Sequence, residues 1–567
     1  MMNTLNDKSN IIPPGKKKRK GRAFPKGRHL SVVAQQDISE LLANKPRRRD
    51  LLIEYLHLIQ DKWNAISEQH LHALANEMQL SQAEVYEVAT FYHHFDVIKA
   101  DQQAAEITVR VCNSLSCCQA GAENILKELQ ENHPANSKVV AAPCMGLCDQ
   151  APAASIGKNY VGHITTDLVR ELINQNKTKP SIPSYQSLDE YLKKGGYSHL
   201  KALKNGDLSA DSVVQAIKDS GLKGLGGAGF PTATKLDIVR SQPAPKFVCM
   251  NADEGEPGTF KDRLYLSSKP HQILEGLLIA AHVIGASQAY IYLRDEYSAI
   301  HSILTKEITE LSKQGLIEEG AIDLRRGAGA YICGEESAMV ESIEGKRGIP
   351  RQRPPYVAHQ GLFQRPTLIQ NVETLYWLPE IVKQGGKWFA EQGKNGAKGP
   401  RSYSVSGRVK NPAVITTAAG STVEELIALC GGMLEGHTFR AYLPGGASGG
   451  ILPAKLGNVP LDFSTLDQYG CFVGSHAVVI LSDQDELADV AVNLMDFFKH
   501  ESCGQCTPCR VGCEKTYELL KQPVWDKPLL RELSSTMTSA SICGLGQAAP
   551  NPVLSILNHF NEANDDS

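Results

Sequence analysis

The sequence predicts a multidomain α/β protein, and three observations lead to this fold class. The chain has 567 residues, which is enough for about four domains of about 150 residues each. Apolar residues recur at helical spacing in some segments and alternate as in strands in others. Eight of the 14 cysteines gather in tight groups, which indicates compact domains built around bound metal.

Composition and charge exclude several classes of protein. Hydrophobic residues make up 42% of the chain and charged residues 21%, so a large core is expected. The net charge of −3 gives no general attraction to nucleic acid or to an anionic membrane. No signal peptide is visible, and no run of about 18 apolar residues occurs. We therefore expect a cytoplasmic protein that binds neither nucleic acid nor membranes.

The N-terminal segment 1–30 is predicted to be a basic, disordered arm. Its strongest feature is the basic run Lys16–Arg22. Such a run suits a targeting signal or a nucleic-acid patch, but we favour an arm that docks on a partner subunit.

Residues 31–103 are predicted to form a helical domain. Apolar residues recur at helical spacing through Arg49–Trp63. Ser81 and Glu84 form a capping-box pattern, which predicts the start of a further helix.

Residues 104–176 are predicted to form a compact α/β domain. Apolar residues alternate from Ile107 to Cys112, as in a strand. A helix at about 120–132 follows, then a strand ending at Pro143 and another around Ala153–Val161.

Residues 177–199 contain two prolines and are predicted to be a linker. Residues 200–395 alternate helices with short apolar strands, such as Lys246–Met250 and Ala289–Leu293. This alternation indicates α/β layers.

The last third of the chain is predicted to hold two small domains. Residues 396–485 are rich in Val, Ile, Gly and Thr, and they predict a β-rich domain with one helix near Val423–Cys430. Residues 486–560 are predicted to be helical around cysteines, and residues 561–567 form a tail.

One cysteine group favours a [4Fe–4S] cluster. Cys503, Cys506 and Cys509 form a C-x2-C-x2-C run, whereas zinc sites normally use two separated pairs. The spacing leaves the fourth ligand open. Cys513 completes a ferredoxin-like run but lacks the following proline, and Cys543 could reach back from the next helical segment.

The other group suits a [2Fe–2S] cluster. Cys112 with Cys117, and Cys144 with Cys148, each follow a predicted strand, so two loops at one sheet edge could hold one cluster. Zinc is the alternative, although its usual pairs are more closely spaced. Cys118 directly follows Cys117 and is expected to point elsewhere. A structural disulfide does not suit a chain without a secretion signal.

A glycine-rich loop is a candidate phosphate site. Gly224, Gly226 and Gly229 match G-x-G-x-x-G, but the dinucleotide fingerprint needs a preceding strand, and Ala210–Ser220 predicts a helix. Backbone amides can still approach a phosphate closely where no Cβ intervenes, and Lys235 could add charge. A glycine turn needed only for packing is the alternative.

An acidic loop follows the predicted strand Phe247–Met250. It runs from Asn251 to Gly258 and carries Asp253, Glu254 and Glu256. Ligands in α/β sheets bind beyond the carboxyl ends of the strands. Carboxylates suit ribose hydroxyls or flavin ring atoms. A calcium-binding loop is one alternative, but the EF-hand spacing is absent here. An ordinary solvated turn is the other alternative.

Together these motifs resemble the two NADH-side subunits of respiratory complex I, fused into one chain. Residues 35–175 resemble the thioredoxin-like [2Fe–2S] subunit through CNSLSC and CMGLCDQAPA. Residues 200–560 resemble the flavoprotein subunit through GLGGAGFPTATK, CMNADEGEPGTFKDR, YICGEESAMVESIEG, RPTLIQNVETL and ESCGQCTPCRVG. The fusion is most similar to the β (diaphorase) subunit of soluble NAD-dependent formate dehydrogenases of the molybdenum or tungsten type. The diaphorase subunit of NAD-reducing hydrogenases shares the same fusion.

The resemblance implies a domain for each region. It implies a thioredoxin-like [2Fe–2S] domain at 104–176 and a Rossmann-like FMN- and NADH-binding domain at 200–395. A ubiquitin-like β-grasp (SLBB-like) domain at 396–485 and a helical [4Fe–4S] bundle at 486–560 would follow. The implied cofactors are FMN, one [2Fe–2S] cluster and one [4Fe–4S] cluster, with NAD(H) as substrate.

The resemblance also assigns site residues. The implied FMN contacts are Gly224, Gly226, Gly227, Lys235, Asn251, Asp253, Glu254, Tyr331, Gly334, Glu335, Asn371 and Thr374. The implied NADH contacts are Phe230, Glu256, Arg353 and Tyr356, with Glu336 near the nicotinamide as the catalytic position. The implied cluster ligands are Cys112, Cys117, Cys144 and Cys148 for [2Fe–2S], and Cys503, Cys506, Cys509 and Cys543 for [4Fe–4S]. Cys513 would then be a packing residue.

Three positions depart from the family's pattern. Leu225 replaces an arginine in the glycine loop, Ile238 replaces an aromatic residue, and Arg353 replaces the lysine before a double proline. These departures concern details of the adenine and phosphate contacts and leave the predicted site itself unchanged.

The function implied is electron transfer between NAD and a partner protein. In a formate dehydrogenase, electrons would pass from a partner's metal–pterin centre through [4Fe–4S] to FMN and then as hydride to NAD. The partner would be a catalytic α subunit with a molybdenum or tungsten pterin and further iron–sulfur clusters. The alternatives are a hydrogenase diaphorase subunit, a fused complex I subunit, or a non-enzymatic scaffold holding zinc. Glu256 near a ribose 2′-hydroxyl would favour NAD over NADP.

Overall fold

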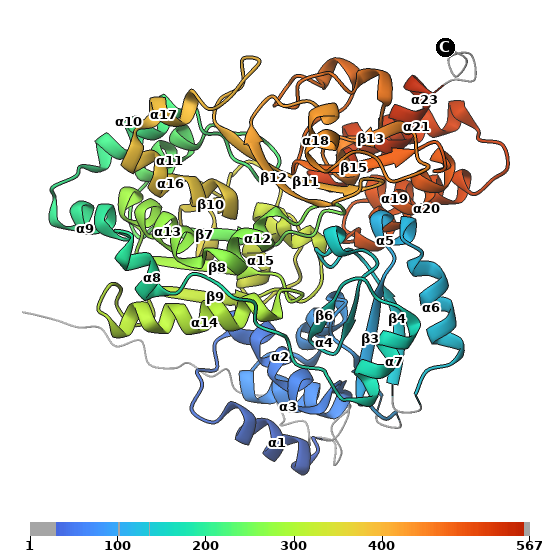
Figure 1. Ribbon diagram of the computed structural model, residues 1–567. Helices are drawn as coiled ribbons and strands as arrows, with labels where there is room; N and C mark the ends of the chain where they lie inside the picture. The colour runs from blue at the N-terminus through green and yellow to red at the C-terminus, as the bar shows by residue number, and fades with distance from the viewer. Residues whose placement is uncertain (1–29, 100–101, 135–136, 561–567) are drawn as a thin grey trace, which may run out of the picture.

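The computed structural model describes residues 30–99, 102–134 and 137–560. The predicted arm at 1–30 and the tail at 561–567 therefore lie outside the described residues, apart from Leu30. Figure 1 shows the N-terminal helices at one end of the molecule and the β-rich and C-terminal helical regions at the other. No helix in the described part of the chain is both long and apolar enough to cross a membrane.

The N-terminal domain is helical, as the sequence predicts. Ser81 accepts from the backbone N–H of Glu84, and the Glu84 carboxylate accepts from the N–H of Ser81, so the predicted capping box is confirmed. A short parallel pair of strands joins the segment after α2 to the segment after α4. The elements are α1 (Val32–Leu42), α2 (Leu52–Trp63), β1 (Ile66–Ser67), α3 (Glu68–Met78), α4 (Gln82–Phe91) and β2 (Val97–Ile98).

The next domain is a four-stranded mixed sheet with the order β4-β3-β5-β6. The predicted strand Ile107–Cys112 is β3, and its inward residues Val109 and Val111 are fully buried. It pairs in parallel with β4 and antiparallel with β5, so the loops after β3 and β4 leave the sheet at the same edge. The other elements are α5 (Leu115–Gln119), α6 (Ala122–Glu131), β4 (Ser137–Ala142), β5 (Ala154–Ile156), β6 (Asn159–Val161) and α7 (Thr166–Asn174).

The predicted linker at 177–199 is only partly a linker. Its second half contains the helix α8 (Leu188–Lys193), which begins at a capping box formed by Ser187 and Glu190. Leu188 and Tyr197 are buried in the core of the following domain. The prediction was wrong here because two anchoring apolar side chains outweigh the prolines upstream.

The central domain has a four-stranded parallel sheet with the order β10-β7-β8-β9. Its strands are β7 (Phe247–Ala252), β8 (Gln288–Leu293), β9 (Ile322–Arg326) and β10 (Thr367–Asn371). Asn371 lies opposite Asn251 in the register, so both strands end at one point of the sheet edge. The surrounding helices are α9 (Ser198–Asn205), α10 (Ala210–Ser220), α11 (Thr232–Arg240), α12 (Lys261–Ser268), α13 (Pro270–Ile284), α14 (Ser298–Lys313), α15 (Glu336–Ile343), α16 (Val372–Gln384) and α17 (Gly386–Ala390).

A five-stranded mixed sheet follows, with the order β12-β11-β15-β13-β14. Its strands are β11 (Pro400–Gly407), β12 (Ala413–Ala418), β13 (Phe439–Leu443), β14 (Leu452–Pro453) and β15 (Ala477–Ser482). The predicted helix is α18 (Val423–Leu429), and it packs its apolar face into the core of this sheet.

The chain ends in five helices. They are α19 (Leu487–Glu501), α20 (Thr507–Leu520), α21 (Lys527–Ala540), α22 (Gly544–Ala548) and α23 (Asn551–His559). One apolar core joins these helices to α1–α4 and to one face of the central sheet. The cysteine-bearing helices are therefore held rigidly against the central domain.

Candidate functional site

The main candidate site is a cavity of about 590 Å³ beyond the carboxyl ends of β7 and β10. The glycine loop, the acidic loop and the segment around Tyr331 form its walls in the central domain. The β-rich domain and α22 close it. Predicted site residues that line the cavity are Gly226, Gly227, Asn251, Asp253, Glu254, Glu256, Tyr331, Gly334, Glu335 and Asn371.

The glycine loop approaches the cavity with its backbone. A Cβ on Gly226 would lie 3.0 Å from the Cβ of Asn371, so little more than a hydrogen fits there. Gly227 has φ of +142°, a conformation that favours glycine. The N–H of Leu225 donates to Thr374 Oγ1 at 2.9 Å, which ties the loop to α16. The loop is therefore a cradle for a group that needs backbone contacts.

Asp253 carries a polar atom that lacks a partner. Its Oδ2 is buried and has no hydrogen-bond donor among the described residues, although it belongs to a cavity wall. Burial raises the pKa of Asp253 well above its usual value. An unsatisfied buried oxygen costs free energy, so this position fits a ligand that brings an N–H or O–H donor. The ring and side chain of a flavin provide such donors.

The two glutamates of the acidic loop already have partners. Glu254 accepts from the N–H groups of Asp262 and Arg263, at 2.8 and 3.0 Å, and so caps α12. Burial raises the pKa of Glu254 to about 7. Glu256 accepts from the N–H and hydroxyl of Ser448 at 2.7 Å, and from the Tyr331 hydroxyl. Both residues therefore hold the cavity walls together.

Sequence reasoning missed Lys261, a buried cation in the cavity wall. It forms ion pairs with Asp262 at 2.9 Å and with Glu373 at 3.0 Å. Burial opposes its charge, but the carboxylates of Asp262 and Glu373 outweigh this and raise the pKa of Lys261. The sequence did contain a signal for this residue, because Lys261 begins the motif KDR shortly after the acidic loop.

Several predicted residues lie away from the cavity wall. Lys235 pairs with Glu336 at 3.2 Å, and Arg353 bonds to Glu335. Gly224 and Thr374 support the glycine loop without lining the cavity. The rings of Phe230 and Tyr356 are 47% and 55% exposed, which is unusual for large aromatic side chains.

The part of the cavity wall outside the central domain was not predicted. Ser448, Phe463 and the segment Phe472–Ser475 come from the β-rich domain. Gly544, Leu545 and Ala548 come from α22. These contacts join residues far apart in the chain, and no local pattern in the sequence signals them.

The first cysteine group is brought together as predicted. Cys112, Cys117, Cys144 and Cys148 are all buried, and Cys144 Sγ lies 3.3 Å from Cys148 Sγ. Cys117 is hydrogen-bonded to Cys112, and these two thiols also interact electrostatically with the other pair. The hydrogen bond with Cys148 lowers the pKa of Cys144 to about 6, and the charge of Arg294 acts in the same direction. Cys118 points elsewhere and donates to the carbonyl of Asn113. Four convergent thiols suit a [2Fe–2S] cluster.

The second group lies beside the cavity. Cys503, Cys506 and Cys509 precede or begin α20, and Cys543 directly precedes α22, which lines the cavity. The hydrogen bond with Cys513 lowers the pKa of Cys509 to about 7. Cys513 is fully buried one helical turn beyond Cys509, whereas Cys543 is partly exposed. The thiols suit a cluster adjacent to the cavity.

Arg294 connects the cavity to the first cysteine group. Its guanidinium is 4% exposed and donates to the carbonyl of Glu254 and, at 2.6 Å, to the carbonyl of Cys144. Glu296 accepts a third hydrogen bond at 2.7 Å and neutralises the charge. The acidic loop and the cysteine loop are thus held by one side chain.

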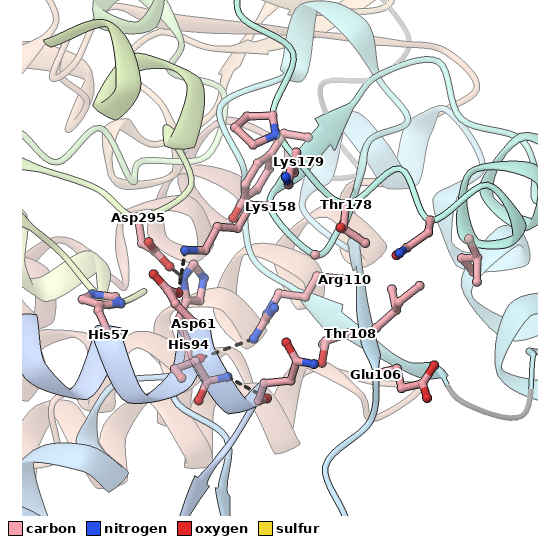
Figure 2. Close-up of a pocket in the computed structure, with 18 of the residues that line it drawn as sticks. His57, Asp61, His94, Glu106, Thr108, Arg110, Lys158, Thr178, Lys179 and Asp295 are labelled. Atoms are coloured by element: carbon pink, nitrogen blue, oxygen red, sulfur yellow. Dashed lines mark hydrogen bonds and ion pairs between the residues drawn. The ribbon is translucent and has the colours of Figure 1, made fainter. Parts of the chain in front are cut away.

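A second, larger cavity of about 680 Å³ lies where the N-terminal helical domain, the domain of strands β3–β6 and the central domain meet. Figure 2 shows Lys158 reaching Asp61 and His94 reaching Asp295, at 2.5 and 2.7 Å. Arg326 also pairs with both aspartates. Most charges in this cavity are satisfied by one another, and no predicted site residue lines it. We therefore interpret this cavity as part of the contact between the domains.

Comparisons with known proteins match four parts of the chain. The Nuo51 FMN-binding domain matches residues 217–380, and the thioredoxin-like [2Fe-2S] ferredoxin matches 38–177. The SLBB domain matches 402–452, and the NADH-ubiquinone oxidoreductase-F iron-sulfur binding region matches 489–566. An NADH-quinone oxidoreductase subunit of Rhizobium meliloti (strain 1021) is 40% identical over 396 residues, 67% of this chain and 94% of that protein. The chain belongs to this NADH-quinone oxidoreductase family.

Relatives from other complexes show the same likeness. NADP-reducing hydrogenase subunit HndC of Solidesulfovibrio fructosivorans is 37% identical over 66% of this chain and 79% of its own length. A crystal structure of an NAD+-reducing [NiFe]-hydrogenase in the H2-reduced state has a chain with a TM-score of 0.80 and 31% identity. The match covers 91% of this chain and 92% of that one, so it includes the N-terminal fusion.

The family membership confirms the coarser predictions. The chain is an NADH-oxidising flavin and iron–sulfur protein with FMN, a [2Fe–2S] cluster and a [4Fe–4S] cluster as cofactors. The relatives named above are subunits of larger complexes. A mixed α/β chain with thioredoxin-like, FMN-binding and SLBB domains and a helical C-terminal region is likewise confirmed.

Gly227→Ala is expected to lower the FMN content of the purified protein. Alanine is strained at φ of +142°, by about 1–3 kcal/mol, and the loop would have to move. Flavin and iron are to be measured in the same sample, and iron should stay unchanged. Gly206→Ala is the matched control, because this exposed glycine also has a positive φ, of +84°, with open space around it and away from the cavity. Equal flavin loss in both variants would contradict a specific role of Gly227.

Proposed function

We propose that FMN lies between the glycine loop and the acidic loop, with its phosphate at the glycine loop. Three features support this placement: the close backbone approach at Gly226, the unpaired oxygen of Asp253, and the N-terminus of α16 at Asn371. When bound there, FMN would supply the chemistry of hydride acceptance from NADH and release of single electrons. The proposed contacts that line the cavity are Gly226, Gly227, Asn251, Asp253, Glu254, Tyr331, Gly334, Glu335 and Asn371. Gly224, Lys235 and Thr374 act by supporting these walls.

NADH is proposed to enter where Phe230 and Tyr356 present exposed rings, which suit stacking on adenine. Glu256 would accept from ribose hydroxyls in place of the Tyr331 hydroxyl that it now binds. Arg353 is a further proposed NADH contact, and Glu336, which lies 3.6 Å from it, would lie near the nicotinamide.

Electrons are proposed to reach both clusters from this cavity. Cys543, next to the cavity wall, is the proposed fourth [4Fe–4S] ligand with Cys503, Cys506 and Cys509. The cluster at Cys112, Cys117, Cys144 and Cys148 would serve as a branch, connected through Arg294.

We also propose two finer fold assignments. The β-rich domain is assigned to the ubiquitin-like β-grasp class, because β11 and β15 are parallel central neighbours and α18 covers one face. The central domain is assigned as Rossmann-like from its parallel sheet, although a helix precedes the glycine loop.

We propose that the whole complex is a cytoplasmic NAD-dependent formate dehydrogenase. The resemblance of the fused N-terminal region to the β subunit of those enzymes supports this assignment. The partner would be a catalytic α subunit with a molybdenum or tungsten pterin and further iron–sulfur clusters. The second candidate is the diaphorase subunit of an NAD-reducing hydrogenase, which the match over 91% of the chain favours.

Purification of the native complex through an affinity tag on this chain separates the two candidates. We expect formate-dependent reduction of NAD, with molybdenum or tungsten in a co-purifying subunit. Hydrogen-dependent reduction of NAD with nickel in the partner would instead establish the second candidate and rule out the first.

Glu256→Gln is expected to raise the KM for NADH severalfold, with a smaller effect on kcat toward an artificial acceptor. The amide keeps the size of the side chain but loses the charge and one acceptor oxygen for the ribose. Steady-state kinetics on samples with matched FMN content measure this. Glu319→Gln, an equal charge change at an exposed loop residue, is the control. An unchanged KM would exclude the proposed ribose contact.

A further inference from the structure

Two histidines and a glutamate from different domains converge outside the flavin cavity. His93 follows α4 of the N-terminal domain, and His500 and Glu501 end α19. One ligand atom from each residue lies within 4.8 Å of the other two. In the described residues 30–99, 102–134 and 137–560, this is the one group of three such side chains found at that spacing.

We propose that His93, His500 and Glu501 bind a divalent transition-metal ion, with Zn²⁺ as the best fit. Imidazole nitrogens and a carboxylate oxygen suit zinc and its neighbours in the first transition row. Magnesium and calcium prefer sets of oxygen ligands. Two nitrogens and one oxygen leave a fourth position for water.

The distances are close to those of a tetrahedral site. Zinc bonds of about 2.0–2.1 Å place two ligand atoms about 3.3 Å apart. His500 Nδ1 and Glu501 Oε1 are 3.3 Å apart, and His93 Nδ1 lies 3.8 Å from the same oxygen. The two imidazole rings lie 4.1 Å apart between centroids.

The carboxylate is held in place for this role. Glu501 Oε2 accepts from the N–H of Tyr331 at 2.9 Å, which leaves Oε1 directed at the two imidazoles. Such secondary contacts orient a metal ligand. His93 is positioned by its backbone N–H, which donates to the carbonyl of Gly329 at 3.3 Å.

An ion can reach the site from solvent. The side chains of His93 and His500 are 37% and 50% exposed, whereas Glu501 is 2% exposed. A metal here would join the N-terminal domain to the cluster-bearing helices, two residues before Cys503. Its expected effect is to clamp these domains together.

Zinc binding by the holoprotein tests the proposal. The protein, with both clusters intact, is dialysed against buffered Zn²⁺, and zinc and iron are counted in the same sample. The expected result is one zinc per chain without loss of iron, and a melting temperature that rises with zinc concentration.

His93→Ala and His500→Ala should each weaken zinc binding at least about tenfold and abolish the thermal shift, because each removes a direct ligand. Glu501 is not substituted in this test, because its carboxylate also accepts from the N–H of Tyr331. His282→Ala, an exposed histidine on α13, is the control and should bind zinc normally. The proposal is overturned by absent zinc binding, by zinc that enters only as iron leaves, or by undiminished binding in both histidine variants.

Discussion

One buried guanidinium, that of Arg294, joins the flavin-side loop to the first cysteine loop. It donates to the carbonyls of Glu254 and Cys144, and Glu296 balances its charge. A buried charge is stable only when its partners stay in place. The thioredoxin-like domain and the central domain therefore cannot shift independently without leaving this charge unpaired. The spacing between the flavin cavity and the four cysteines follows from that constraint.

Contacts between domains also explain why several domains are needed to form the flavin cavity. The parallel sheet brings Asn251 and Asn371 to one edge, but this edge alone would be open to water. Ser448 of the β-rich domain closes it by binding Glu256, and α22 adds an apolar wall next to Cys543. Exclusion of water strengthens every electrostatic contact inside the cavity. Fusion of these domains in one chain keeps the walls together.

Local patterns in the sequence predicted much of this arrangement. Alternation identified β3, a capping box identified α4, and cysteine spacing identified both thiol groups, because each feature depends on neighbouring residues. Long-range contacts were not predictable in this way. Ser448 and Phe463 belong to the cavity wall only because distant segments fold against it. Long-range contacts also explain the pairing of Lys235 with Glu336 and the ordered second half of the linker.

The reduction potential of the [2Fe–2S] cluster tests the central role of Arg294 most directly. A positive charge beside the cysteines stabilises the reduced cluster, so its loss should lower the potential. EPR-monitored redox titration of Arg294→Gln should show a decrease on the order of tens of millivolts, and Arg294→Lys should show a smaller one. Arg170→Gln, an equal charge change at the surface of the thioredoxin-like domain, should have no effect. An unchanged potential in both Arg294 variants, with clusters and FMN retained, would contradict the account.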